Sequence, residues 1–144
     1  MDLLSDMADI VILDLTSNFM ADNFTLWGLE KAEKVITVIN PDNKSLGFLN
    51  SYKKLIDNEI KFDTRKHVIV LNNCYVYSPY EKVMEENGYE YYLPHSYEIY
   101  NNFNCSYRDF FRGSEKETST FHKTIKEIVG KELNFGWDYK YSIW

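Results

Sequence analysis

Short apolar runs recur along the chain, and each is followed by a polar turn or an amphipathic segment. The first three runs, residues 9–14, 35–39 and 67–72, are rich in Val and Ile and are too short for helices. Continuous apolar runs of this kind are typical of parallel strands that are buried on both faces. A fourth run, residues 89–93, ends at Pro94. The pattern therefore predicts four strands.

Amphipathic segments separate the predicted strands. Apolar residues recur at helical spacing from Asp22 onward, over residues 44–58 and over residues 117–133. Residues 78–87 have the same character and are followed by Gly88, a residue type that commonly ends helices. The spacing therefore predicts a helix in each interval between the strands and a longer helix near the end of the chain.

The order of strands and helices predicts one α/β domain over residues 1–133. We expect a mostly parallel open sheet with helices on both faces, as in Rossmann-like three-layer sandwiches. Residues 94–113 predict a long loop with one helical turn at 107–111. Residues 134–144 form an aromatic tail in which Tyr, Trp and Phe occupy roughly every second position. This alternation suits packing on the domain's own surface, an edge strand or a partner interface.

Composition and charge exclude several classes of function. The 144 residues carry a formal charge of −6 with scattered Lys and Arg, so the sequence shows no direct signal for nucleic-acid binding. No apolar run reaches the ~18 residues that cross a bilayer, and the acidic start lacks the features of a secretory signal. We expect a cytoplasmic protein whose two cysteines, Cys74 and Cys105, stay reduced. The high aromatic content is typical of AT-rich bacterial coding.

Candidate chemistry lies at the carboxyl ends of the strands, where open α/β sheets bind ligands. The first three predicted strands end in short polar residues, Asp14, Asn40 and Asn72. A carboxylate at such a place can hold Mg²⁺ through water beside the phosphates of a nucleotide. Asp and Asn are also common turn formers and helix caps, so a purely structural role stays open for each. The three histidines have no spacing typical of a metal site, and we expect no metalloenzyme.

The order of these motifs resembles the ParA/MinD group of deviant P-loop ATPases. The resemblance rests on the Asp9–Asp14 run, the Ala32–Leu46 stretch with its Asn-Pro-Asp-Asn-Lys-Ser-Leu loop, the Val68–Asn72 run and the Leu93–Pro94 pair. It covers nearly the whole chain, from the first of these runs to about Leu133. It implies a partial P-loop NTPase fold and a site for ATP or ADP with Mg²⁺.

The resemblance implies roles for four residues. Asp14 matches the Walker B aspartate, the catalytic residue that binds Mg²⁺ through water when a nucleotide is present. Asn72 matches the asparagine that contacts the adenine, and the loop at Pro94 lies against the same base. Asn73 stands where the family often has an arginine, and it joins them as a candidate for cofactor binding. Family members act as dimers, so the resemblance also implies self-association.

The chain departs from the family because it has no glycine-rich phosphate loop with its lysines. Residues 15–18 also replace the proline that usually follows the Walker B aspartate. Without the loop the phosphates have no cradle, and we do not expect this chain to hydrolyse ATP alone. Residues 1–7 resemble the end of a helix, which favours a fragment of a longer ATPase, with a missing N-terminal half, over a degenerate scaffold.

The favoured hypothesis is the adenine half of an ATPase that positions DNA, cell-division or secretion machinery. An alternative is a non-catalytic protein-interaction scaffold of the same fold. A further alternative is a receiver-like signalling domain, in which Asp14 would accept a phosphoryl group. A receiver domain needs two more acidic residues on an earlier strand and a lysine at the end of a later strand, and the chain offers neither.

Overall fold

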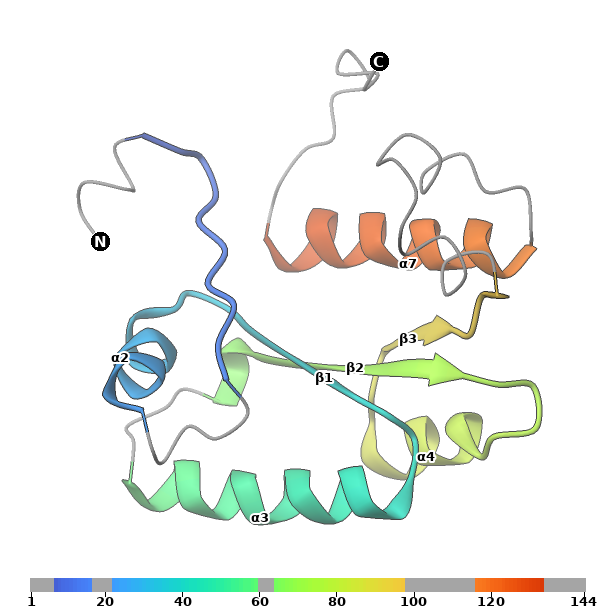
Figure 1. Cartoon of the computed structure of the whole chain (residues 1–144), viewed down its shortest axis with the longest axis horizontal. Coiled ribbons are helices and arrows are strands. Elements are labelled where there is room, and N and C mark those ends of the chain that lie inside the picture. Colours follow the sequence, from blue (N-terminus) through green and yellow to red (C-terminus); the bar gives the residue numbers. More distant parts are fainter. Residues whose placement is uncertain (1–6, 17–21, 60–63, 98–115, 134–144) are drawn as a thin grey trace.

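A parallel sheet of three strands organises the part of the chain that the structure describes. The computed structural model describes residues 7–16, 22–59, 64–97 and 116–133 (Figure 1). The loop turn expected at 107–111 and the aromatic tail lie outside these ranges. The elements in chain order are α2 (Asn23–Lys31), β1 (Val35–Ile39), α3 (Asn43–Glu59), the short 3₁₀ helix η2 (Thr64–Lys66), β2 (His67–Cys74), α4 (Tyr80–Asn87), β3 (Tyr91–Pro94) and α7 (Lys116–Glu132).

The strands lie in the order β1-β2-β3, and both neighbouring pairs are parallel. Val35 of β1 lies opposite His67 of β2, and this register is unbroken as far as Ile39 and Leu71. The pairing of β2 with β3 becomes irregular between Leu71 and Cys74. Four consecutive residues in the first part of β2 are buried, as expected for a central parallel strand that is covered on both faces.

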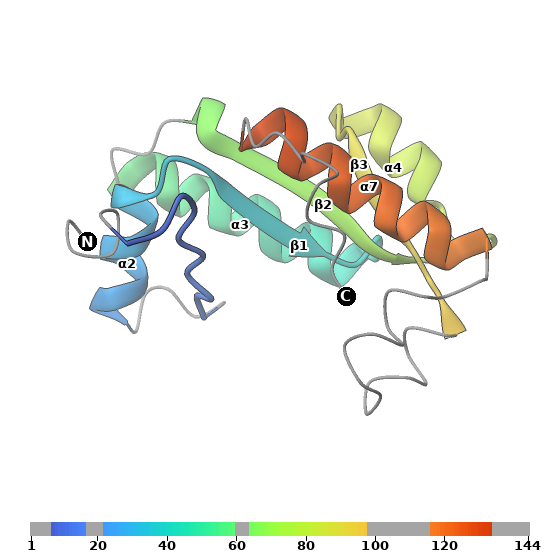
Figure 2. The ribbon, with the colours of Figure 1, turned by 90° about the horizontal axis from the view of Figure 1, so that it is seen from above.

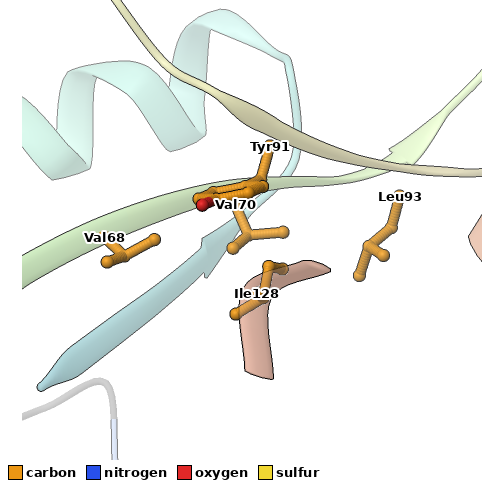
Figure 3. Close-up of a cluster of buried hydrophobic side chains, with 5 residues drawn as sticks. All are labelled: Val68, Val70, Tyr91, Leu93 and Ile128. Carbon is orange, nitrogen blue, oxygen red and sulfur yellow. The ribbon is translucent and has the colours of Figure 1, made fainter. Parts of the chain in front are cut away.

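Helices cover both faces of this sheet. Figure 1 shows α7 on one side and α3 and α4 on the other, and Figure 2 shows the same arrangement from above. Ile128 of α7 forms an apolar cluster with Val68 and Val70 of β2 and with Tyr91 and Leu93 of β3 (Figure 3). The predicted α/β fold with an open sheet between helices is therefore confirmed, and all three described strands are parallel.

The opposite face of β2 forms a second core. Leu71 and Cys74 cluster there with Val83 of α4. Burial raises the pKa of the Cys74 thiol to about 12, so the thiol stays protonated at neutral pH and packs as a small apolar group. A structural role for Cys74 agrees with this burial, whereas Cys105 lies outside the described residues.

The strand predicted at residues 9–14 is wrong. Residues 7–16 form no regular element; they lie beside α2 (Figures 1 and 2), and Ile12 is 85% exposed. Leu15 packs in a cluster with Leu29 of α2 and Val35 of β1 instead. A strand forms only when its backbone groups pair with a neighbour. In the described structure residues 9–14 pair with none of the three strands, and an apolar run alone does not specify such a pairing.

Helix boundaries agree closely with those predicted, because local capping sets them. Asp22 caps α2: its carboxylate accepts hydrogen bonds from the Thr25 hydroxyl (2.6 Å) and the Phe24 amide (3.0 Å), and these bonds lower its pKa. Asp42 caps the start of α3 in the same way. Gly88 ends α4 with a φ of 66°, a left-handed conformation that glycine adopts without steric cost.

A half-buried histidine joins β1 to β2. The Nε2 atom of His67 lies 2.6 Å from the hydroxyl oxygen of Thr37, and its ring lies beside that of Tyr52 from α3. Burial, helped by the positive charge of Lys53, lowers the pKa of His67 from 6.5 to about 4. The imidazole is therefore neutral in the folded protein at neutral pH.

The central position of Leu71 makes its side chain the most sensitive test of the core. Leu71 is 0% exposed, and Leu71→Ala should lower the free energy of unfolding by about 3 kcal/mol, because it leaves a cavity between the sheet and α4. The control Val76→Ala removes a side chain that is 84% exposed and should cost less than about 0.5 kcal/mol. Urea unfolding followed by circular dichroism measures both, and equal losses would contradict the assigned core.

His67 should make stability depend on pH. The pKa is lower in the folded protein than in the unfolded chain, so folding is favoured by the neutral form, and this contribution is complete above pH 6.5. It should be lost progressively as the pH falls from 6.5 to about 4. Urea midpoints at several pH values should fall more steeply for the wild type than for His67→Gln, which cannot titrate in this range. Parallel curves for the two proteins would refute the assignment.

Candidate functional site

The candidate site lies where β2 and β3 end. Parallel strands present their carboxyl ends to one edge of the sheet, and open α/β folds bind ligands there. In Figure 1 this edge is on the side of the β2 arrowhead, where the chain turns back toward α4. The site consists of Asn72, Asn73, Tyr75, Pro94 and His95, which we call the carboxyl-edge cluster.

Asn73 gives this edge its shape. Its φ is 59°, and it is the only non-glycine residue with a positive φ in the described ranges. The same residue falls inside the irregular step between Leu71 and Cys74, so the chain bulges just before β2 ends. Left-handed backbone costs a non-glycine residue free energy, although Asn tolerates it better than most. Such a conformation persists only when surrounding contacts hold it.

His95 supplies one of these contacts. Its Nδ1 lies 2.6 Å from Oδ1 of Asn73, and its backbone N–H donates a hydrogen bond to the carbonyl oxygen of Cys74 (3.0 Å). A carboxamide oxygen only accepts hydrogen bonds, so Nδ1 of His95 is the donor in the first pair. The side chain of Asn73 and the ring of His95 therefore fix each other across the ends of the two strands.

Aromatic rings enclose His95. The ring of Tyr75 stacks on the imidazole with a centroid separation of 4.2 Å and an angle of 21°, and Tyr97 meets it edge-on at 4.8 Å. Tyr75 nevertheless remains 45% exposed, and Tyr97 is exposed as well. The cluster therefore presents a fixed aromatic surface to solvent at the edge of the sheet. Planar rings of ligands stack on such surfaces.

Asn72 contributes a carboxamide group to the cluster. It is partly buried, and within the described structure its carboxamide makes no hydrogen bond, whereas that of Asn73 is occupied by His95. Pro94 of β3 lies opposite Cys74 of β2, so it lies at the same end of the sheet as Asn72 and Asn73. The structure thus brings together Asn72, Asn73 and Pro94, the three residues that the sequence suggested for the base side of a nucleotide site.

The structure does not bring Asp14 to this cluster. Asp14 is exposed and precedes Leu15, which packs against Val35 at the amino end of β1. The five residues of β1 span about 16 Å at ~3.3 Å per residue, so Asp14 lies at the opposite edge of the sheet from Asn72. The reason is the absence of a strand at residues 9–14. Ser17 and Asn18, which follow it, lie outside the described residues.

The aromatic members of the cluster, Tyr75 and His95, are not among the site residues that the sequence predicts. The histidines lack the spacing of a metal site, and Tyr75 belongs to no motif. Their positions carried a usable signal, because His95 directly follows Pro94 and Tyr75 comes two residues after Asn73. Aromatic residues just beyond the ends of adjacent parallel strands are placed to meet at the ligand-binding edge.

Comparison with known proteins adds no identification. No family model, curated protein or solved structure matches this chain. The described helices include none that is long and apolar enough to cross a membrane. Among the residues with a described position, no group of three or more His, Cys, Asp or Glu side chains could hold a metal ion. The carboxyl-edge cluster therefore has to be interpreted from its own chemistry.

The strain at Asn73 can be separated from its hydrogen bond by two substitutions. Asn73→Gly loses the bond to His95 but adopts the φ of 59° freely, whereas Asn73→Ala loses the bond and keeps the steric cost. The glycine variant should therefore be more stable than the alanine variant by about 1 kcal/mol in urea unfolding. An alanine variant as stable as the glycine variant would show that the left-handed backbone is not maintained in solution.

Proposed function

We propose that this chain binds the base of an adenine nucleotide at the carboxyl-edge cluster, as the adenine half of a ParA/MinD-type ATPase. One observation carries the proposal: the ring of Tyr75 stacks on His95, which is hydrogen-bonded to Asn73, the residue that follows Asn72 at the end of β2. An aromatic face and a carboxamide at this edge are the two groups that recognise a purine. The sequence resemblance supports the same residues.

The chemistry of a carboxamide favours adenine over other bases. Its oxygen accepts a hydrogen bond from N6 while its NH₂ group donates one to N7, and the two bonds form together. Guanine presents acceptors at both corresponding positions, so the same carboxamide cannot pair with it in this way. Stacking on an aromatic residue adds about 1–3 kcal/mol without regard to base identity. In this proposal Asn72 supplies selectivity and Tyr75 supplies affinity.

The proposal does not assign a binding site to the phosphates of the nucleotide. The sequence contains no glycine-rich lysine loop to hold them. The proposed binding of the adenine base does not depend on Asp14. A magnesium-side role for Asp14 requires residues 9–14 to join the sheet parallel to β1, because only then would this carboxylate reach the carboxyl edge. Hydrolysis of ATP by this chain alone is not part of the proposal.

The wider role follows from the resemblance. ATPases of this group position DNA, cell-division or secretion machinery, and they act as dimers around the nucleotide. We propose the same setting for this chain, with self-association or a separate N-terminal half completing the site. The residues of the cluster do not indicate which of these structures the protein would position.

A non-catalytic interaction module is the second candidate. It is favoured by the exposed apolar residues that directly follow β2, Tyr75, Val76 and Tyr77, because such residues are enriched in protein interfaces. The receiver-like alternative loses its main support, since Asp14 does not end a strand in the described structure. Nucleotide binding separates the first two candidates, because only the ATPase proposal requires selectivity for adenine.

Calorimetric titration with ADP and with adenosine tests the proposal. Both ligands should bind saturably and more tightly than guanosine, and Asn72→Ala should weaken binding of both by tenfold or more, because about 1–3 kcal/mol of base recognition is lost. Tyr75→Ala should weaken binding by a similar factor. Retained folding of each variant is checked by circular dichroism.

Asn40→Ala is the matched control. It removes the same carboxamide at the same edge of the sheet, one residue beyond β1, and it should leave the affinity for ADP unchanged. Equal effects of the Asn40 and Asn72 substitutions would reject the assignment of the base to Asn72. Failure of adenosine to bind at millimolar concentration would reject the proposed function as a whole and leave the interaction module.

A further inference from the structure

An open groove of about 580 Å³ is lined by residues of α4, of the turn that follows this helix, and of β3. We call it the α4–β3 groove. Its volume is within the range of sites that bind small ligands. The groove shares no residue with the carboxyl-edge cluster, so it is a separate candidate for a binding site on the same domain.

Helical periodicity places two kinds of side chain along the α4 side of the groove. Tyr80 and Met84 lie one helical turn apart, and Glu81 and Glu85 repeat this spacing one position further along the chain. All four residues line the groove. One stripe of the helix is therefore apolar and aromatic, and the neighbouring stripe is acidic.

The β3 side contributes the same two kinds of side chain. Glu90 directly precedes β3 and Tyr92 is the second residue of the strand, so the two are one strand period apart and both line the groove. The ring of Tyr92 lies 4.8 Å from that of Tyr80, measured between centroids. The two tyrosines are partly buried, whereas the glutamates are exposed. The groove thus combines a partly buried aromatic surface with carboxylates that reach solvent.

The charge of the groove is negative throughout its described lining. No Lys or Arg lines it. Among the ion pairs between described residues, none includes Glu81, Glu85 or Glu90. Glu81 and Glu85 also repel each other, because like charges four residues apart on a helix are unfavourable. A cationic ligand would relieve this repulsion, so the charge of the groove is complementary to a basic partner.

A cation of the chain itself already lies over one ring of the groove. The Nζ atom of Lys53 from α3 is 5.6 Å from the centroid of the Tyr89 ring. This distance is within the ~6 Å at which an aromatic face attracts a positive charge. Tyr89 is part of the lining of the groove. The aromatic surface is therefore suited to cations, and the rings of Tyr80 and Tyr92 lie in the same lining as the carboxylates.

We propose that the α4–β3 groove binds an arginine-rich segment of a partner protein. A guanidinium group is planar and always charged, so it can stack on Tyr80 or Tyr92 and pair with a carboxylate of Glu85 or Glu90. A polyamine carries several charges but has no planar group that stacks on a ring, and arginine is favoured for this reason. The formal charge of −6 on the whole chain also attracts a basic segment at long range.

Fluorescence anisotropy with a fluorescein-labelled peptide of alternating Arg and Gly tests the proposal on the full chain. The peptide should bind saturably. The double substitution Glu85→Gln/Glu90→Gln should weaken binding by about fivefold, because two exposed ion pairs are lost. Tyr92→Leu should weaken binding by about two- to fivefold, since it keeps an apolar side chain but removes the face that attracts a cation. Circular dichroism checks that each variant is folded.

Glu33→Gln/Glu86→Gln is the matched control. It removes the same charge from two exposed glutamates that do not line the groove, and it should leave the affinity within about twofold of the wild type. Equal weakening by the two double substitutions would overturn the proposal, because the peptide would then respond only to net charge. Failure of the peptide to bind at millimolar concentration would also overturn it.

Two further measurements define the ligand and the site. Spermidine that displaces the peptide at concentrations below that of the peptide itself would identify a polyamine as the ligand and overturn the proposal. Asn72→Ala should leave the affinity for the peptide unchanged, because Asn72 does not line the groove. A loss of peptide binding in this variant would place the peptide at the carboxyl-edge cluster and overturn the assignment to the α4–β3 groove.

Discussion

Burial of β2 on both faces is the constraint on which the rest of the structure depends. Val68 and Val70 face α7, while Leu71 and Cys74 face α4. A strand in this position can carry almost no polar side chains along its length, so polar groups collect where it ends. The asparagines of the carboxyl-edge cluster occupy the positions near the end of β2 at which the strand is only partly buried. The core therefore decides where ligand chemistry can be placed.

The bulge at Asn73 connects this core to the candidate site. Because the chain takes a left-handed step there, Cys74 returns to the buried face while Asn73 turns toward His95. Tyr75 stacks on His95, and Asn73 is hydrogen-bonded to His95. The aromatic surface is therefore ordered in the protein without a ligand. A surface that is ordered in advance loses less conformational entropy on binding. The left-handed step at Asn73 thus contributes to ordering the proposed binding surface.

Much of the fold could be predicted from the sequence, because β1, β2, α3, α4 and α7 have patterns that match their burial and caps that match their ends. The run at residues 9–14 has the same composition but failed as a strand, since apolar character does not specify a pairing partner. Asn72, Asn73 and Pro94 were identifiable as strand-end residues. The part played by His95 was not, because it depends on a register irregularity and on ring contacts between β2 and β3 that no local pattern encodes.

The contacts of Glu132 have a mechanical consequence. One carboxylate holds Lys34 at the start of β1 and Tyr91 at the start of β3, two strands that are not neighbours in the sheet. Fraying of the last turn of α7 would release both attachments together. The amino ends of the two outer strands are therefore tied to each other through the helix, although the strands themselves do not pair.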